Sequence, residues 1–318
     1  MIAALAGLAP HLAAVEQRMS DALVTDEPRV ARLIDGLGSF HGKMLRPSLI
    51  LLVAEASGGV QPVHIHLGAA LELIHTATLI HDDLIDDAAT RRSRPTAHIS
   101  FGNTTAVLLG DYFYTHAFDL VAGLGDQVAT KRLTETTNII CRGELHQQCA
   151  ARDTTLSEDE YNRIILAKTA ALTELAGELG APVDQPAQRQ AAAAYGRACG
   201  MAFQIVDDCL DFSGDPAKVG KTLSTDIERG RLTLPLIRLL QSAGEQRPAI
   251  ERQLLSASTA DEVQAVKRLV VASGALQAAL TTARTHVASA RLELSAFPAG
   301  PARQALDQLA EFIVARDF

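Results

Sequence analysis

Helical periodicity, almost without strand patterns, is the feature that most constrains what this 318-residue chain can fold into. Apolar and polar residues alternate with a period of about 3.6 residues, and the strong helix formers Ala, Leu, Glu, Gln and Arg dominate. The stretches predicted to be helical are residues 63 to 88, 103 to 123, 128 to 151, 158 to 180, 186 to 213, 232 to 243, 261 to 272 and 302 to 315. The chain is therefore predicted to be all-α.

Short breaks rich in glycine and proline separate these helices. They are Gly58-Gly59, Gly123 to Gly125, Gly180 with Pro182, Gly214-Asp215-Pro216, and Phe297 to Pro301. Ser157 followed by Glu160 predicts a capping box at the start of one helix. No linker, repeat or low-complexity segment divides the sequence. We expect residues 1–318 to form a single domain, one large bundle of about ten or more helices.

Charge and hydropathy exclude several classes of protein. With 29 basic and 37 acidic residues the net charge is −8, which argues against non-specific binding of nucleic acid or anionic membranes. The apolar first fifteen residues have no basic n-region and are interpreted as the first helix. No uninterrupted apolar run reaches the roughly eighteen residues of a membrane span. We expect a cytoplasmic protein with reduced, mostly buried thiols at Cys141, Cys149, Cys199 and Cys209.

An acidic run interrupts one of the most apolar predicted helices. In LIHDDLIDDA, Asp82 and Asp86 share one helical face, and Asp83 and Asp87 form a second pair about 100° around the helix. Like charges at this spacing destabilise a helix, and burying them among apolar residues costs more. The run therefore predicts a cation that compensates the carboxylates.

The same pattern recurs in FQIVDDCLDF, where Asp207 and Asp211 share a face and Asp208 lies beside them. A single acidic run is equally consistent with a solvated helix face, but two matched runs with apolar flanks favour a metal site. Carboxylates without His or Cys select Mg²⁺, which binds one or two of them together with substrate phosphates. The two clusters therefore predict Mg²⁺ and a phosphorylated substrate.

Basic residues lie beside both acidic clusters. They are Arg91, Arg92 and Arg94 after the first cluster, Lys43 and Arg46 in GKMLRP, Lys168 in a third helix, and Lys221 after the second cluster. Each one alone is typical of a solvated surface. Because Arg and Lys are the usual ligands of a diphosphate, their shared position beside the acidic clusters predicts a diphosphate-binding site.

These residues lie within ordered motifs that cover the chain from about Gly42 to Ile237. The motifs are GKMLRP, ELIHTATLIHDDLIDDAATRRSRPT, FGNTTAVLLGDYF, GELHQ, KTAAL, YGRACGMAFQIVDDCLDF and GKTLSTDIERGRLTLPLI. The sequence thereby resembles the trans-isoprenyl diphosphate synthases of the polyprenyl synthetase family, most closely the octaprenyl-type longer-chain members. The resemblance implies the all-helical isoprenoid synthase bundle, a homodimer, and Mg²⁺-assisted condensation of an allylic prenyl diphosphate with isopentenyl diphosphate.

The resemblance also implies roles for individual residues. Those expected to bind isopentenyl diphosphate are Lys43, Arg46, His75 and Arg92. Those expected to contact the allylic diphosphate are Arg91, Lys168, Thr169, Gln204 and Lys221. The expected metal ligands are Asp82, Asp83 and Asp86 in the first cluster and Asp207, Asp208 and Asp211 in the second. Among these, Asp82, Asp86, Lys168 and Lys221 are the expected catalytic residues.

The sequence departs from the family pattern at four positions. His41, Ser93 and Ser224 stand where the family usually has Gly, and Arg231 stands where it usually has Lys. His75 forms an ExxH with Glu72, as in di-iron bundles, but those need two such motifs. A lone helical His is most often a packed core residue, and here the family resemblance favours ligand binding.

Product length is predicted from the helix that precedes Asp82. A growing chain is expected along its apolar face, past Thr78, Ala77, Ile74 and Leu71. In short-chain relatives an aromatic residue five positions before the first aspartate closes this groove, whereas here that position is Ala77. We therefore expect the enzyme to extend farnesyl or geranylgeranyl diphosphate to an all-trans product of about 30 to 50 carbons, since each helical turn adds about 5.4 Å of depth.

Other functions stay open at this stage. They are a short-chain farnesyl or geranylgeranyl diphosphate synthase, a silent subunit of a heteromeric synthase, a head-to-head condensing enzyme and a terpene cyclase. A head-to-head enzyme would not need GKxxRP, a cyclase would normally carry an Asn/Ser/Glu metal motif, and silent subunits typically lose the acidic clusters.

Overall fold

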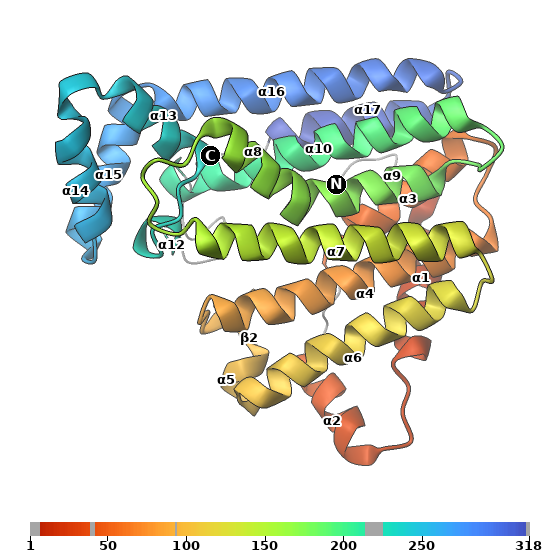
Figure 1. Cartoon of the computed structure of the whole chain (residues 1–318). Coiled ribbons are helices and arrows are strands. Elements are labelled where there is room, and N and C mark those ends of the chain that lie inside the picture. The colour runs from red at the N-terminus through yellow and green to blue at the C-terminus, as the bar shows by residue number, and fades with distance from the viewer. Residues whose placement is uncertain (1–6, 39–41, 93, 214–224, 316–318) are drawn as a thin grey trace. The chain divides into compact units, whose positions relative to one another are not determined.

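The computed structural model describes residues 7–38, 42–92, 94–213 and 225–315, and these are almost entirely helical (Figure 1). The prediction of an all-α protein is confirmed. Within the described ranges the only strands are β1 (Thr90–Arg91) and β2 (Arg94–Pro95), which pair antiparallel with Arg91 opposite Arg94. This small turn follows the first acidic cluster directly, so it determines where the neighbouring arginines lie.

Most predicted helices begin and end within three residues of the predicted positions. They are α4 (Pro62–Ile85), α6 (Asn103–Ala122), α7 (Gln127–Cys149), α10 (Pro186–Ser213), α13 (Leu234–Ser242), α15 (Ala260–Ala272) and α17 (Pro301–Val314). The predicted helix over 158 to 180 is interrupted: α8 (Glu158–Ile165) leads into a π-helix, η2 (Leu166–Ala170), and then α9 (Ala171–Gly180). The capping box before α8 is confirmed, with the Ser157 side chain accepting from the Glu160 amide.

The Cα positions cluster into two compact units. Unit 1 comprises the described residues of Met1–Glu135, Leu175–Ala193 and Leu294–Asp307, and unit 2 those of Thr136–Glu174, Ala194–Glu293 and Gln308–Phe318. The chain passes from one unit to the other within α7, α9, α10 and α17. Each helix is locally continuous through these points because its backbone hydrogen bonds span only four or five residues.

Unit 1 is built around α4, which packs against α1 (Ala9–Ala22), α3 (Leu45–Ala56) and α6 (Figure 1). Its other elements are α2 (Pro28–Leu37), α5 (Ala97–Phe101) and η4 (Leu294–Ala296). Leu71 and Ile74 of α4 are fully buried, as is Phe113 of α6. By length and composition α4 could cross a membrane, but 67% of its most apolar window is buried inside the structure, as in the core helix of a soluble protein.

In unit 2, α13 packs against α14 (Arg247–Ser256), α15 and α16 (Ala275–Glu293). It also contains α8, η2, α12 (Thr225–Glu228) and η3 (Gly244–Gln246). The expectation of mostly buried thiols holds for two of the four: Cys199 and Cys209 are buried in α10, whereas Cys141 and Cys149 are exposed on α7. The 3.6-residue period of α7 places both cysteines on its exposed face. The amino-acid composition of the chain does not indicate this placement.

Candidate active site

In unit 1, the turn between β1 and β2 brings Arg91 back onto the first acidic cluster. The Arg91 Nε donates to both carboxylate oxygens of Asp83 at 2.8 Å, and its Nη2 lies 2.8 Å from Asp83 Oδ1. Although burial opposes it, the bonds to Asp83 and the charges of Asp82, Asp83 and Asp86 raise the pKa of Arg91. Three of the predicted metal ligands and one predicted substrate ligand therefore lie together.

A second group in unit 1 surrounds His75 on α4. Burial lowers the pKa of His75 well below its usual range, and the charges of Arg46, Arg91 and Arg92 lower it further. One turn earlier Glu72 is only 2% exposed, and its Oε2 has no hydrogen-bond partner. Burial raises the pKa of Glu72 even though Arg46 and Arg92 oppose the shift. Neutral His75 and three arginines thus form a strongly cationic region that would attract an anion.

The loop before α3 reaches the same region, because Gly42 lies against the Arg92 guanidinium. A Cβ on Gly42 would lie 2.7 Å from Arg92 Nη2, and one on Gly38 would collide with the Arg94 guanidinium. Lys43 follows Gly42 directly and is exposed. The four residues predicted to bind isopentenyl diphosphate therefore belong to one part of unit 1.

Unfavourable backbone conformations gather around this region. Four non-glycine residues among those described have positive φ, and three belong here: Met44 (50°), Asp87 (47°) and Arg92 (50°). Each such conformation costs on the order of 1–3 kcal/mol, and such residues cluster at ligand sites. Met44 precedes α3, Asp87 ends the first acidic cluster, and Arg92 lies in the turn between the strands.

In unit 2, the π-helix η2 carries the predicted residues Lys168 and Thr169. A π-turn inserts one extra residue into a helix and is frequent at functional sites. The Lys168 Nζ lies 2.5 Å from Glu144 Oε2 and donates to Gln147 Oε1 at 2.8 Å, both on α7. A Cβ on Gly143 of α7 would lie 2.8 Å from the backbone nitrogen of Lys168, so only glycine permits this close packing.

On its other side η2 contacts α10. A Cβ on Gly200 would lie 2.6 Å from the Ala170 Cα. The Thr169 hydroxyl donates to Gln204 Oε1 at 2.7 Å. The amide of Gln204 then donates to Asp208 Oδ1 at 2.7 Å, and the Tyr161 hydroxyl donates to Asp208 Oδ2 at 2.6 Å. These bonds link η2, α8 and the second acidic cluster.

Burial dominates the electrostatics of this chain of hydrogen bonds. Tyr161 and Asp208 are 3% and 5% exposed. Burial and the charge of Asp226 raise the pKa of Asp208 well above its usual range, against the opposing bonds from Tyr161 and Gln204. Burial and the Asp208 charge also raise the pKa of Tyr161. The phenol therefore stays protonated and acts as a hydrogen-bond donor.

The remaining predicted residues of unit 2 that the structure describes are Asp207 and Asp211. Asp207 is half-buried and Asp211 is 4% exposed. The backbone amide of Asp226 donates to Asp211 Oδ2 at 3.4 Å, and Arg231 Nη1 lies 4.0 Å from Asp226 Oδ1. The Arg at position 231 therefore supplies positive charge next to the second cluster. Lys221 and the departures His41, Ser93 and Ser224 lie outside the described residues.

The donor set fits a hard divalent cation, because both clusters offer carboxylate oxygens without His or Cys. No group of three or more His, Cys, Asp or Glu side chains among the described residues could hold a metal ion by protein ligands alone. Asp83 is bound by Arg91, and Asp208 is bound by Tyr161 and Gln204. Mg²⁺ typically takes only one or two carboxylates and completes its shell with water and substrate phosphate, so this arrangement is compatible with it.

Some described residues that interact with predicted site residues were not assigned from the sequence. Glu144 and Gln147 hold Lys168, Tyr161 holds Asp208, and Glu72 interacts with Arg46. The motif GELHQ carried a signal, since its Glu and Gln are three residues apart and share a helical face. Tyr161 had none, because its partner lies 47 residues away in the sequence.

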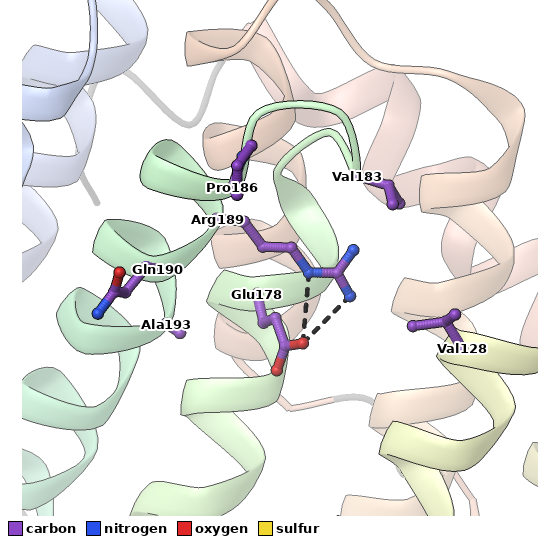
Figure 2. A pocket seen from close by; sticks show the side chains of 7 residues that line it. All are labelled: Val128, Glu178, Val183, Pro186, Arg189, Gln190 and Ala193. Atoms are coloured by element: carbon purple, nitrogen blue, oxygen red, sulfur yellow. Dashed lines mark hydrogen bonds and ion pairs between the residues drawn. The ribbon is translucent and has the colours of Figure 1, made fainter.

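A separate hollow of about 390 Å³ lies in unit 1, and none of its lining residues is a predicted site residue (Figure 2). Glu178 accepts hydrogen bonds there from Arg189, as the dashed lines mark, and also from Arg132. Although burial opposes it, these bonds lower the pKa of Glu178. Both arginines are thus compensated by acidic partners, which is typical of a structural ion-pair cluster.

Comparison with known proteins identifies related chains along almost the whole length. Residues 27–272 match the family model described as polyprenyl synthetase. The chain is 33% identical to octaprenyl diphosphate synthase of Escherichia coli (strain K12), covering 97% of both chains. It is 34% identical to a short chain isoprenyl diphosphate synthase of Methanothermobacter thermautotrophicus, covering 95% of this chain and 94% of the relative. A crystal structure of polyprenyl synthase from Caulobacter crescentus, complexed with calcium and isoprenyl diphosphate, is 33% identical with a TM-score of 0.93, covering 98% of this chain and 97% of that one.

Proposed function

Because this chain belongs to the polyprenyl synthetase family and is a prenyl diphosphate synthase, we propose that it extends farnesyl or geranylgeranyl diphosphate with isopentenyl diphosphate. The condensation is head-to-tail and gives a longer all-trans polyprenyl diphosphate. Residues 1–318 act as one polyprenyl synthetase domain.

The observation that carries this proposal is the pairing of cations with carboxylates in unit 1. Arg46, Arg91 and Arg92 act together on His75, while the charges of Asp82, Asp83 and Asp86 act on Arg91. A region with both signs of charge suits a diphosphate that is bound by arginines on one side and by metal-bearing carboxylates on the other. Lys43, Arg46, His75 and Arg92 would bind isopentenyl diphosphate.

The second group of residues would bind the allylic substrate. The residues that would contact it are Arg91, Lys168, Thr169, Gln204 and Lys221. Mg²⁺ would be held by Asp82 and Asp86, with Asp83 beside them, and by Asp207 with Asp208 and Asp211 behind it. When bound, the metal supplies positive charge to the diphosphate oxygens. The Caulobacter crescentus structure, which is a complex with calcium and isoprenyl diphosphate, supports a divalent cation at such a site.

The reaction requires the allylic C–O bond to break, with its electron pair leaving on the diphosphate. Lys168 and Arg91 stabilise that negative charge by Coulomb interaction and hydrogen bonding. The double bond of isopentenyl diphosphate then attacks the allylic cation, and the released diphosphate accepts the proton that the condensed cation loses. Apolar side chains of α4 exclude water, which would otherwise quench the cation.

The length of the product depends on the apolar face of α4. Ala77 and Ile74 are fully buried in unit 1, and Thr78 is half-buried. The small side chains at positions 77 and 78 support an elongation path past this point, and hence a product of about 30 to 50 carbons at about 5.4 Å of depth per helical turn. A short-chain synthase is the alternative, because relatives at similar identity make short and long products.

A homodimer is the proposed assembly, and exposed apolar side chains support it. Val107 and Leu108 of α6 are 42% and 61% exposed. Large apolar residues exposed next to each other on a helix are typical of a protein interface. The burial of α4 supports a soluble, cytoplasmic enzyme. A silent subunit of a heteromeric synthase is disfavoured because both acidic clusters are intact.

The decisive experiment incubates the purified chain with Mg²⁺, labelled isopentenyl diphosphate and geranyl, farnesyl or geranylgeranyl diphosphate. Chromatography of the dephosphorylated products should give alcohols longer than twenty carbons. A dominant alcohol of fifteen or twenty carbons would favour the short-chain alternative, and no product from any primer would favour the silent subunit. Sedimentation of the wild type and of Leu108→Glu tests the homodimer, which the charged variant should dissociate.

A further inference from the structure

We propose that Tyr161 is a positioning residue for prenyl transfer: its hydroxyl holds Asp208, and through Asp208 and Gln204 it sets the position of Thr169 and Lys168. This inference rests on the proposed function, because Thr169 and Lys168 matter here as ligands of the allylic diphosphate. Tyr161 itself lies in the last turns of α8, before η2, and is 3% exposed.

Each hydrogen bond in the series from Tyr161 to Thr169 has a defined donor and acceptor. Tyr161 donates to one oxygen of Asp208, and the Gln204 amide donates to the other, so both carboxyl oxygens are engaged by the protein. Because the nitrogen of Gln204 faces Asp208, its oxygen faces Thr169 and accepts the hydroxyl proton. Asp208 therefore orients its neighbours through both of its carboxyl oxygens.

Thr169 differs from Thr76 and Thr130 in the direction in which its hydroxyl donates. Thr76 and Thr130 donate to the carbonyl four residues earlier in their own helices. Thr169 instead donates across to Gln204 on α10. The side chain next to it, Lys168, is bound to Glu144 and Gln147 on α7. The π-turn is thus fixed from both sides, by an ion pair toward α7 and by this hydrogen-bond chain toward α10.

Loss of the Tyr161 hydroxyl has no ready compensation. Asp208 is 5% exposed, so bulk water does not replace the missing donor. The Asp208 carboxyl is then held by Gln204 alone, so its rotation about χ2 and the orientations of Gln204 and Thr169 are less restricted. Misplacing a substrate ligand by about 1 Å can cost about 100-fold in rate.

The test compares Tyr161→Phe with Tyr195→Phe. Tyr195 is another buried tyrosine of unit 2, and its hydroxyl interacts with Cys199. Tyr161→Phe should lower kcat by about 10- to 100-fold and leave the KM for isopentenyl diphosphate unchanged. By calorimetry it should weaken binding of a thiolo analogue of farnesyl diphosphate, which does not ionise. Tyr195→Phe should behave as the wild type in each measurement.

Two further variants separate positioning from general destabilisation. Incorporation of 4-aminophenylalanine at position 161 retains a donor and should restore most of the rate. In an Asp208→Asn background, Tyr161→Phe should lower kcat little further, because both substitutions interrupt the same series of hydrogen bonds. Equal kinetics and equal analogue binding for the two Tyr→Phe variants would overturn the inference, as would full additivity with Asp208→Asn. Wild-type inactivity in the same assay would instead contradict the proposed function.

Discussion

Arg91 binds Asp83 through both carboxylate oxygens, with its Nε 2.8 Å from each and its Nη2 2.8 Å from Oδ1. This geometry predicts different roles for Asp82 and Asp83, the first two residues of the first acidic cluster. Asp83 orients Arg91, whereas Asp82 on the neighbouring face of α4 is assigned to the metal. We therefore expect Asp83→Asn to raise the KM for the allylic substrate by less than tenfold with kcat little changed. Steady-state kinetics with Asp82→Asn as the matched variant tests this, and equal losses would contradict it.

Metal dependence is the second prediction. Chelation by EDTA should abolish turnover, and added Mg²⁺ should restore it. Asp82→Ala or Asp207→Ala should reduce kcat by orders of magnitude, because charge on the leaving diphosphate is then poorly compensated. Circular dichroism should report an unchanged helical content in both variants. Near-full activity of Asp82→Ala would remove that cluster from the site.

Substitution of Lys43 and substitution of Lys168 should affect the kinetics of different substrates. Lys43→Ala should raise the KM for isopentenyl diphosphate much more than that for the allylic diphosphate, because Lys43 directly follows Gly42, which lies against the Arg92 guanidinium. Lys168→Ala should act mainly on the allylic substrate and on kcat. Glu144→Gln, which removes the ion pair to Lys168, should reproduce a milder form of the Lys168 effect. Equal effects of the two lysine variants on both substrates would remove the distinction.

Product length should change with the side chain at position 77. Ala77→Phe fills space on the face of α4 along which the product is expected to grow, and should shorten it to about fifteen or twenty carbons at about 5.4 Å per turn. Ala70→Phe, on the same helix two turns earlier, is the comparison and should permit a longer product than Ala77→Phe. Chromatography of dephosphorylated products measures both, and an unchanged distribution in Ala77→Phe would mean that the chain takes another path.

The pH dependence of stability should carry a contribution from His75. Burial and three arginines lower its pKa well below the usual value, so the folded protein keeps it neutral while the unfolded chain takes up a proton near pH 6.5. Folding stability is therefore lost as the pH falls below about 6.5, by at most about 1.4 kcal/mol per pH unit for this group. In urea unfolding at pH 7.5 and 5.5, His75→Gln should lose less stability than the wild type. An equal loss would show that His75 is protonated in the folded protein.

The helices and the identity of the chemistry could be read from the sequence because both depend on local patterns. Helical periodicity, the Ser157 capping box and the glycine breaks involve residues within about four positions of each other. The spacing of Asp82 and Asp86 on one face is equally local. The π-turn at Leu166–Ala170 was not predicted, since Lys168 and Thr169 fit an ordinary helical period and the extra residue is stabilised by α7 and α10.

The tertiary structure decided which side chains bind the predicted residues and hold them in position. Arg91 returns to Asp83 only because a two-residue strand pair reverses the chain, and Tyr161 reaches Asp208 over a separation of 47 residues. Such partners depend on how the helices pack and on which buried hydrogen-bond donors are out of reach of water. The spacing of residues in the sequence indicates neither of these. The sequence by itself therefore determined the all-α class, the family and the acidic and basic motifs, whereas packing determined the hydrogen-bonded residues that hold those motifs in position.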